Sequence, residues 1–274
     1  MTTTAVDTTE VRLLLEGIHE RYGFDFRDYA EASIRRRILR RVQAEGLATI
    51  SALQERVLHD TECMERLLLS LTVHVTAMYR DPLFFKVFRD KVVPLLRTYP
   101  FIRIWHAGCS TGEEVYSTAI VLEEEGVYDR CRIYATDLSE SVLRAAKAGI
   151  FTLHHMKEYS ENYLQAGGTR SLSHYYTASY ERAIFRENLR RNVVFAQHNL
   201  VTDSSFNEFN VILCRNVMIY FNRTLQNRVH GLLYQSLGRL GVLGLGRKES
   251  MRFTPHEESY EELDGPEKIY RKVI

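Results

Sequence analysis

Paired cysteines, long hydrophobic runs and an excess of charge of one sign are all missing from this 274-residue sequence. Its four cysteines are scattered without a Cys-x-x-Cys pair, which argues against a disulfide framework or a zinc site. No apolar run approaches the roughly 20 residues that a membrane helix needs, and the N-terminus lacks the pattern of a signal peptide. The net charge of +1 provides no overall field for nucleic acid or a membrane surface. We therefore expect a cytoplasmic protein that binds no metal and does not insert into a membrane.

The composition, 45% hydrophobic and 26% charged, is that of a globular protein large enough for one small and one large domain. Apolar residues recur at helical spacing from residue 8 to about 70, which predicts a helical N-terminal domain over 1–72. A linker and a helix over 73–98 would follow, with Asp81-Pro82 as a helix start. Strands and helices alternate in 99–274, which predicts an α/β domain.

One predicted N-terminal helix carries an unusual concentration of arginine. Five arginines and no acid occupy the nine positions from Ser33 to Arg41, beside a buried stripe of Ile34, Ile38 and Val42. A solvated helix surface is the ordinary explanation. Arginine without lysine favours instead a surface that binds carboxylates, because guanidinium pairs with them bidentately.

The stretch from Ile102 to Ile120 predicts a strand, a turn of small residues and a helix. Such a turn lets a ligand approach the backbone and the free N–H groups of the helix start. Glu113 and Glu114 stand at that start and would repel a phosphate, so S-adenosylmethionine, with its hydroxyls and positive charge, fits better than a pyrophosphate. A plain strand-to-helix turn with acids favouring the helix dipole is an equally good explanation of this stretch alone.

Asp137 ends the next predicted strand, 25 residues after Gly112. Taken alone it suits a helix cap, with Ser139 or Ser141 as other candidates, but after a ligand-binding turn a ribose-binding acid is favoured. Further along, short strands over Tyr175–Phe185 predict a small β insertion at about 165–192 that could accept a peptide strand.

The most apolar predicted strand begins at Phe209 and exits into Arg215, Asn216 and Tyr220. Ligands of doubly wound sheets lie at the carboxyl ends of strands, so these three residues are candidates for facing a cofactor or substrate. For any one of them, a return of the loop to the core is an equal alternative.

In this order, several runs resemble the chemotaxis-receptor glutamate methyltransferases, the CheR family, over essentially the whole chain. The runs are Thr76-Ala77-Met78-Tyr79-Arg80-Asp81, Cys109-Ser110-Thr111-Gly112-Glu113-Glu114, Ala135-Thr136-Asp137, His198-Asn199-Leu200 and Cys214-Arg215-Asn216-Val217-Met218-Ile219-Tyr220-Phe221. The second and the last are far more specific than a generic glycine loop.

The resemblance implies a Rossmann-like class I methyltransferase domain with a small antiparallel β insertion, preceded by an all-α domain. It also implies methyl transfer from S-adenosylmethionine, with S-adenosylhomocysteine as product, to glutamates of chemoreceptors for sensory adaptation. Arg80 and Tyr220 would flank the reacting centre, and Asp137 would bind the ribose. The implied cofactor site is His74, Thr76, Arg80, Glu114, Asp137, Asn199, Leu200, Arg215 and Asn216, and the implied receptor-binding set is Arg35, Arg36, Arg37, Arg40 and Arg41.

Some members of the family dock a receptor C-terminal peptide on the β insertion and others do not, so the sequence leaves this docking open. We expect this protein to be a monomer with no nucleic-acid partner. The sequence departs from the family at His74, usually asparagine, at Met78, usually aromatic, and at Arg247-Lys248, usually His-Ser. Two other functions stay open: a methyltransferase for a small molecule or nucleic acid, and a non-enzymatic sensor that keeps the fold. Balanced charge and the lack of an aromatic-basic stripe argue against nucleic acid.

Overall fold

The computed structural model describes residues 5–72 and 75–274. It divides into two compact units. The helical unit holds the described residues up to Thr72 together with Tyr220–Arg228, and the sheet unit holds Val75–Ile219 and Val229–Ile274. His74, expected in the cofactor site, lies outside the described residues. In the described ranges, no helix combines the length and apolarity needed to cross a membrane.

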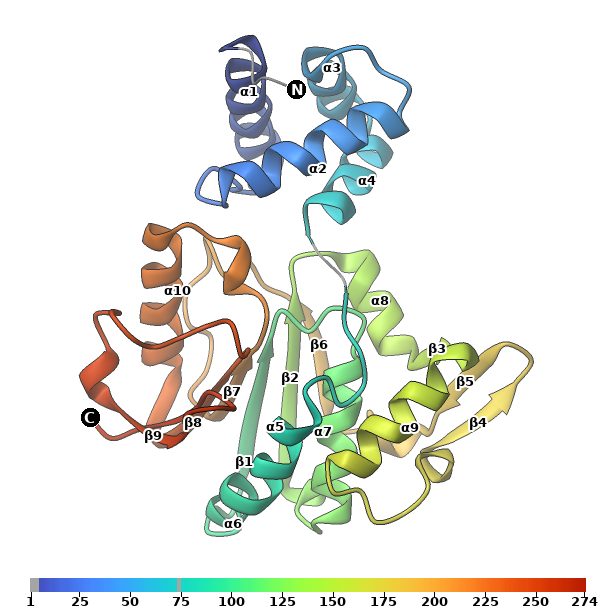
Figure 1. The fold of residues 1–274 in the computed structure, drawn as a ribbon, viewed down its shortest axis with the longest axis vertical. Helices are drawn as coiled ribbons and strands as arrows, with labels where there is room; N and C mark the ends of the chain where they lie inside the picture. The colour runs from blue at the N-terminus through green and yellow to red at the C-terminus, as the bar shows by residue number, and fades with distance from the viewer. Residues whose placement is uncertain (1–4, 73–74) are drawn as a thin grey trace. The chain divides into compact units, whose positions relative to one another are not determined.

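The elements follow the predicted change from helices to an alternation of strands and helices (Figure 1). The helices are α1 (Ala5–Tyr22), α2 (Glu31–Ala44), α3 (Ile50–His59), α4 (Thr61–Leu71), α5 (Pro82–Val87), α6 (Val93–Leu96), α7 (Glu113–Glu124), α8 (Glu140–Ala148), α9 (Met156–Gln165) and α10 (Arg223–Ser236). The strands are β1 (Ile102–Ala107), β2 (Cys131–Asp137), β3 (Ile150–Thr152), β4 (Tyr176–Ser179), β5 (Arg182–Phe185), β6 (Val193–Gln197), β7 (Phe209–Cys214), β8 (Leu237–Leu245), β9 (Tyr260–Asp264) and β10 (Ile269–Lys272).

Two of the N-terminal helices begin with side-chain caps, and α2 has the buried stripe that its sequence predicts. Thr49 caps α3 by accepting the Ala52 N–H, and the carboxylate of Asp60 accepts the Glu62 N–H at the start of α4. Ile34, Ile38 and Val42 of α2 are all buried. The expected stripe therefore forms the inner face of this helix.

The sheet unit is built on one large, mostly parallel sheet with strand order β6-β2-β1-β7-β8-β10-β9. Of these described strands, only β10 runs opposite to the common direction, antiparallel to both β8 and β9. The chain proceeds outward from β1 through β2 to β6 in one direction and from β7 to β8 in the other, where β9 forms the edge and β10 is inserted between β8 and β9. The order reverses between β1 and β7, which is the place where open α/β sheets bind ligands. The expected Rossmann-like domain with a small antiparallel sheet is confirmed.

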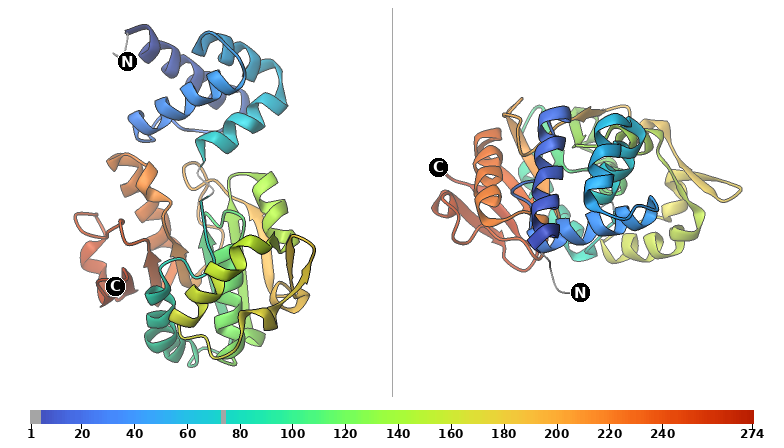
Figure 2. Two further views of the ribbon diagram at one scale, coloured as in Figure 1. Left: turned by 45° about the vertical axis from the view of Figure 1, so that its right-hand side comes forward. Right: turned by 90° about the horizontal axis from the view of Figure 1, so that it is seen from above.

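The small sheet has the order β3-β5-β4 and takes its first strand from Ile150–Thr152. It therefore begins earlier in the chain than the expected insertion at about 165–192. A three-residue strand carries too little pattern to be recognised in the sequence. Figure 2 shows the β4–β5 hairpin extending from the rest of the sheet unit.

One buried carboxylate joins the small sheet's neighbourhood to the main core. Glu124, at the end of α7, accepts hydrogen bonds from the phenols of Tyr163 in α9 and Tyr175 just before β4, and it pairs with Arg89. The side chains of Arg89 and Glu124 are 7% and 5% exposed. Burial and the Glu124 carboxylate both raise the pKa of Tyr175, so this phenol stays a donor. The ring of Tyr79 packs edge-on against Tyr163 at 5.3 Å.

We expect Glu124→Ala to lower the free energy of unfolding by about 3–5 kcal/mol, because it leaves the buried Arg89 guanidinium without its main partner. Glu123→Ala is the matched control, since the neighbouring carboxylate accepts an exposed hydrogen bond from Asn188, and it should change stability by about 0.5 kcal/mol or less. Urea denaturation of both variants gives the comparison. Equal losses of unfolding free energy in the two variants would show that the buried Arg89–Glu124 pair contributes no more than an exposed contact.

Candidate functional site

The turn between β1 and α7 is fixed by its neighbours on both sides. Gly108 and Gly112 adopt φ values of 81° and 95°, a region that favours glycine. The N–H groups of Gly108 and Cys109 donate to the Thr136 carbonyl at 2.9 and 2.8 Å. A Cβ on Gly108 would lie 2.6 Å from Cγ2 of Val217. The turn is thus held to the end of β2 and packs against the loop that follows β7.

Asp137 holds this turn and does not cap a helix. Its Oδ2 accepts the Ser110 N–H at 2.9 Å, and its Oδ1 accepts the Ser139 N–H at 3.3 Å. The N-cap of α8 is Ser139, whose Oγ accepts the Val142 N–H. The structure therefore assigns the cap to Ser139. The Asp137 carboxylate is left at the carboxyl edge of β2, next to the turn.

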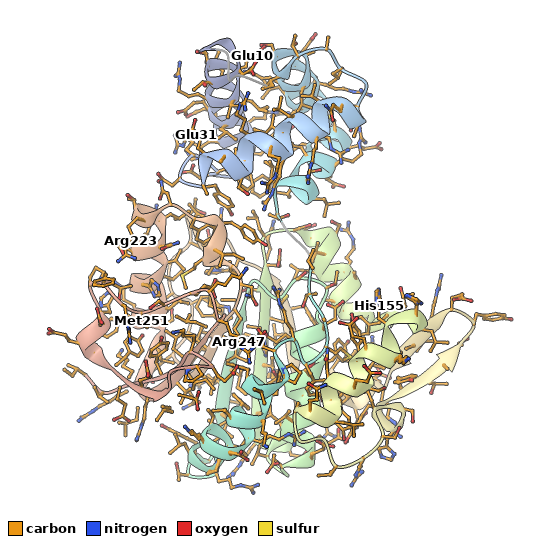
Figure 3. All side chains as sticks on the ribbon, viewed as in Figure 1. Glu10, Glu31, His155, Arg223, Arg247 and Met251 are labelled. Atoms are coloured by element: carbon orange, nitrogen blue, oxygen red, sulfur yellow. The ribbon has the colours of Figure 1, made fainter. Side chains whose placement is uncertain are left out.

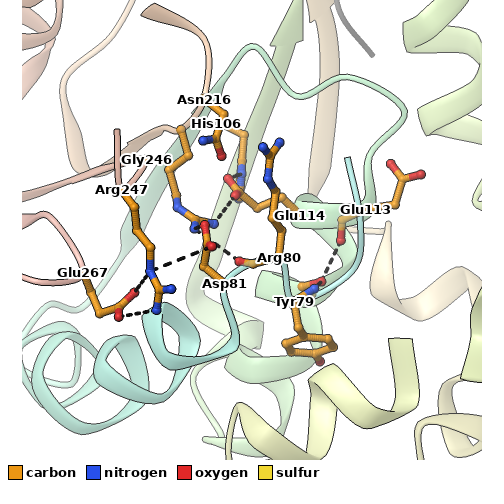
Figure 4. A network of polar contacts seen from close by, with 12 residues as sticks. Tyr79, Arg80, Asp81, His106, Glu113, Glu114, Asn216, Gly246, Arg247 and Glu267 are labelled. Carbon is orange, nitrogen blue, oxygen red and sulfur yellow. Dashed lines mark hydrogen bonds and ion pairs between the residues drawn. The ribbon is translucent and has the colours of Figure 1, made fainter. Parts of the chain in front are cut away.

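Arg215, directly after β7, is the centre of a buried ionic network. Its partners Glu114 and Asp81 are labelled in Figure 4. The Arg215 side chain is only 1% exposed. Nη1 pairs with Oε2 of Glu114 at 2.6 Å, and Nη2 pairs with Oδ2 of Asp81 at 2.8 Å and donates to the Arg80 carbonyl at 3.2 Å. The guanidinium carbon lies 3.9 Å from the ring centroid of Phe84. These contacts join the end of β7 to the start of α7 and to the segment that carries Arg80.

The two acids that begin α7 have opposite electrostatic environments. Burial would raise the pKa of Glu114, but Arg215 and His106, whose Nδ1 lies 3.2 Å away, outweigh it and lower the pKa to about 2. Burial raises the pKa of Glu113 despite a hydrogen bond from Thr111 at 2.6 Å. Neighbouring acids with opposite pKa shifts are typical of functional sites. Glu114 is therefore a fixed negative charge at physiological pH.

Arg80 lies in a segment whose backbone is held in an unusual conformation. Its neighbours Tyr79 and Asp81 have φ values of 51° and 56°, which side-chain-bearing residues adopt rarely. Tyr79 is fully buried and its N–H donates to Oγ of Ser117 at 2.9 Å. The Arg80 guanidinium donates to the Val75 carbonyl at 2.9 Å. Strain of this kind persists only where surrounding contacts impose it, and it concentrates at functional sites.

Arg247, which stands where the family usually has histidine, follows β8 and adds a second arginine to the network around Asp81. Arg247, labelled in Figure 3, pairs bidentately with Glu267 at 3.2 and 2.6 Å. Its Nε lies 3.8 Å from Oδ1 of Asp81. Asp81 is thus placed between two arginines, Arg215 and Arg247.

Glu249 organises the loops that follow β7 and β8, and it was not among the residues expected in the site. Its carboxylate accepts the N–H groups of Gly246, Asn216 and Met218 at 2.7, 2.9 and 2.8 Å. Burial raises the pKa of this carboxyl, and the N–H groups act in the opposite direction. The available signal was an acid three residues after Gly246, the glycine that follows the apolar strand β8.

The expected cofactor residues that the structure describes belong to the sheet unit, and several of them lie at the carboxyl end of β2 or shortly after β6 or β7. Asn199 and Leu200 follow β6, where the neighbouring His198 N–H donates to the Asp137 carbonyl at 3.2 Å. Thr76 belongs to the segment that carries Arg80. The residues placed in this unit are Thr76, Arg80, Glu114, Asp137, Asn199, Leu200, Arg215 and Asn216. Tyr220 belongs to the helical unit.

The five arginines of α2 have different environments, all within the helical unit. Arg35 pairs with Asp7 at 2.7 Å, and Arg41 contacts Ser70 and Glu45. Arg37 is buried. Arg36 and Arg40 are exposed, one turn apart.

Several buried polar atoms around the turn have no hydrogen-bond partner, namely Nε2 of His106, Oγ of Ser110 and Nε of Arg215. Together with the charged Glu114 and the Asp137 carboxylate, they suit a ligand that carries hydroxyls and a positive charge. S-adenosylmethionine has both. Among the residues that the structure describes, no cluster of three or more His, Cys, Asp or Glu could hold a metal ion.

Two family descriptions match the chain in succession: "CheR methyltransferase, all-alpha domain" over residues 9–72 and "CheR methyltransferase, SAM binding domain" over residues 74–269. The chain belongs to the CheR methyltransferase family. The resemblance noted in the sequence is thereby confirmed, and so is the expectation of an enzyme that uses S-adenosylmethionine.

Curated relatives cover nearly the whole chain. A Pseudomonas putida protein named as the methyltransferase Cher3 is 52% identical over 263 residues, covering 96% of each chain. The chemotaxis protein methyltransferase of Salmonella typhimurium is 29% identical over 254 residues, covering 90% of this chain and 85% of its own. That of Listeria innocua is 29% identical over 236 residues, covering 84% and 85%.

The pKa of Glu114 predicts a specific loss of stability in acid. Because its pKa of about 2 in the fold is below the ordinary value of 4.5 for a glutamate carboxyl, its contribution to stability is present above pH 4.5 and is lost as the pH falls toward 2. Wild type should lose about 2 kcal/mol relative to Glu114→Gln between pH 6 and pH 3, measured by urea denaturation.

Glu113→Gln is the matched control for this experiment. The pKa of Glu113 is raised in the fold, so wild type should gain stability relative to this variant as the pH falls. If the difference in unfolding free energy between wild type and Glu114→Gln stays constant with pH, the prediction is wrong.

Proposed function

We propose that this CheR-family enzyme transfers the methyl group of S-adenosylmethionine to glutamate side chains of chemoreceptors in the cytoplasm, forming methyl esters. The observation that carries the proposal is the succession of the two family domains along the chain, with Arg80 beside the network around Glu114. The names of the Salmonella and Listeria relatives, which are chemotaxis protein methyltransferases, support the receptor as acceptor.

The chemistry of this transfer asks for positioning rather than for a base. S-adenosylmethionine supplies an activated methyl group on a sulfonium. A glutamate carboxylate has a pKa near 4.3 and is already ionised at neutral pH, so it attacks without losing a proton. Holding such an acceptor close and in line can lower the barrier by roughly 7–11 kcal/mol in favourable systems.

The residues divide this work as follows. Asp137 would bind the ribose hydroxyls, and Glu114, kept ionised by Arg215, would face the positive charge of the cofactor. Thr76, Asn199, Leu200 and Asn216 would complete the pocket. Arg80 and Tyr220 would hold the acceptor carboxylate. Because attack of a carboxylate on a sulfonium joins opposite charges into neutral products, exclusion of water from the pocket also favours the reaction.

Incubation of the purified protein with labelled S-adenosylmethionine and receptor-containing membranes tests the proposal. We expect base-labile methyl esters on receptor glutamates. Label on a small molecule or nucleic acid would indicate another methyltransferase, and cofactor binding without transfer would indicate a sensor. Failure of calorimetry to detect binding of either S-adenosylmethionine or S-adenosylhomocysteine would reject the cofactor site itself.

Variants in the same assay test the residue roles. Asp137→Ala should weaken cofactor binding, with Asp129→Ala as an exposed aspartate control. Arg80→Ala and Tyr220→Phe should lower turnover. Normal cofactor binding with full turnover in both would refute the positioning roles of Arg80 and Tyr220.

The exposed pair Arg36 and Arg40 is the part of α2 that best suits an acidic receptor helix. We expect the double variant Arg36→Glu/Arg40→Glu to raise the receptor KM roughly tenfold, since two exposed ion pairs contribute about 1–2 kcal/mol. The effect should be larger at low salt, where screening is weaker.

Arg12→Glu/Arg21→Glu is the matched control, because it makes the same change of charge at two exposed positions of α1. Steady-state kinetics at two ionic strengths compare the variants. An equal rise of KM in both would indicate a general charge effect and not a surface on α2.

The small sheet offers a further contact with a receptor. In the described chain, β4 pairs only with β5, so its outer edge can accept an added peptide strand. Docking of a receptor C-terminal peptide there stays a prediction, and KM values for receptors with and without that segment test it.

A further inference from the structure

The backbone around Tyr220 is held by the residues that precede α2. The Ala30 N–H donates to the Tyr220 carbonyl at 2.8 Å, and the Asn222 N–H donates to the Asp28 carbonyl at 2.9 Å. Between them, the rings of Tyr29 and Phe221 pack edge-on at 4.9 Å. Although Tyr220 follows a strand of the sheet unit in sequence, its local structure depends on the N-terminal helices.

The side chain of Tyr220 has a partner in α2 itself. The guanidinium carbon of Arg37 lies 4.7 Å from the centroid of the Tyr220 ring, within the range of a cation–π interaction. Arg37 also donates to the Leu71 carbonyl at the end of α4, a group that the helix leaves without an internal partner. Only 8% of Arg37 is exposed.

Arg37 therefore differs from the arginines beside it. Arg36 and Arg40 project from the outer face of α2. Arg37 lies on the buried stripe with Ile34 and Ile38. A side chain that is buried and already engaged with a carbonyl and an aromatic ring cannot also be offered to an acidic receptor helix.

We propose that Arg37 is a positioning residue for methyl transfer: it orients the Tyr220 ring and does not bind the receptor. The inference rests on the proposed function, because it takes Tyr220 as a residue that holds the acceptor carboxylate. By this proposal α2 has two roles: Arg36 and Arg40 on its outer face bind the receptor, and Arg37 on its inner face orients Tyr220.

The proposal predicts separate effects on kcat and KM. Arg37→Met keeps the length and apolar character of the stem but removes the charge and the donors. We expect it to lower kcat by roughly 10- to 100-fold, since small misplacements of positioning groups have effects of this size, with a receptor KM within about twofold of wild type. Arg12→Met, at an exposed position of α1, is the matched control, and it should leave both kcat and KM nearly unchanged.

A double-mutant cycle tests whether Arg37 acts through Tyr220. The proteins are wild type, Arg37→Met, Tyr220→Leu and the double variant, each assayed with receptor membranes and checked by circular dichroism. If Arg37 acts through Tyr220, the double variant should have the kcat of Tyr220→Leu alone. Arg37→Lys should restore part of the kcat, because an ammonium can still donate to Leu71 and face the ring.

Three results would overturn the inference. They are losses in kcat that multiply in the double variant, a raised KM with normal kcat in Arg37→Met, and a lowered thermal stability with normal kcat, which would make Arg37 only a cap of α4. If Arg37→Met does not fold, the cycle is run with Arg37→Lys. Wild type without receptor methylation would reject the proposed function, whereas an active wild type with multiplying losses would reject only the role of Arg37.

Discussion

The buried guanidinium of Arg215 is the contact on which the rest of the site depends. It neutralises Glu114 at the start of α7 and Asp81 at the start of α5, and it stacks over Phe84. Three separate stretches of chain thereby converge on one charge. Removing the guanidinium would leave the Glu114 carboxylate without its cationic partner in a place nearly closed to water, which is strongly destabilising.

The contacts that Arg215 makes in the structure are with its protein neighbours. The family resemblance implied a cofactor contact, and in the structure the two terminal nitrogens are already engaged with protein oxygens. Its more direct effect is on neighbours: it keeps Glu114 ionised and fixes the backbone of Arg80. Arg247, which departs from the family pattern, holds the other side of Asp81.

The loop after β7 distributes its residues between the two units. Asn216 and Met218 are held by the carboxylate of Glu249 in the sheet unit. Tyr220 and Phe221 are held by the residues before α2 in the helical unit. The orientation of the Tyr220 side chain is therefore set by contacts within the helical unit, as a reaction that depends on alignment requires of a positioning residue.

Much of the fold could be predicted from sequence because its signals are local. Helical spacing identified α1 to α4, and apolar runs followed by small residues or acids identified β1, β2 and β7. The family motifs implied a Rossmann-like class I domain but not the strand order of its sheet. Short strands such as β3, and β9 with its acidic composition, carried no pattern strong enough to be recognised. The turn at Gly108–Gly112 and the acid at Asp137 were found because their spacing is itself the signal.

The sequence by itself determined the architecture, the family and the candidate residues of the cofactor site, since these depend on short segments and their order. Only the tertiary structure decided which arginine of α2 is buried, which acid holds the loops and to which unit Tyr220 belongs. The physical reason is separation along the chain. Arg37 meets the Leu71 carbonyl 34 residues away, and Arg215 meets Glu114 101 residues away. Partners so distant leave no periodic trace in either segment, so their pairing appears only when the chain is folded.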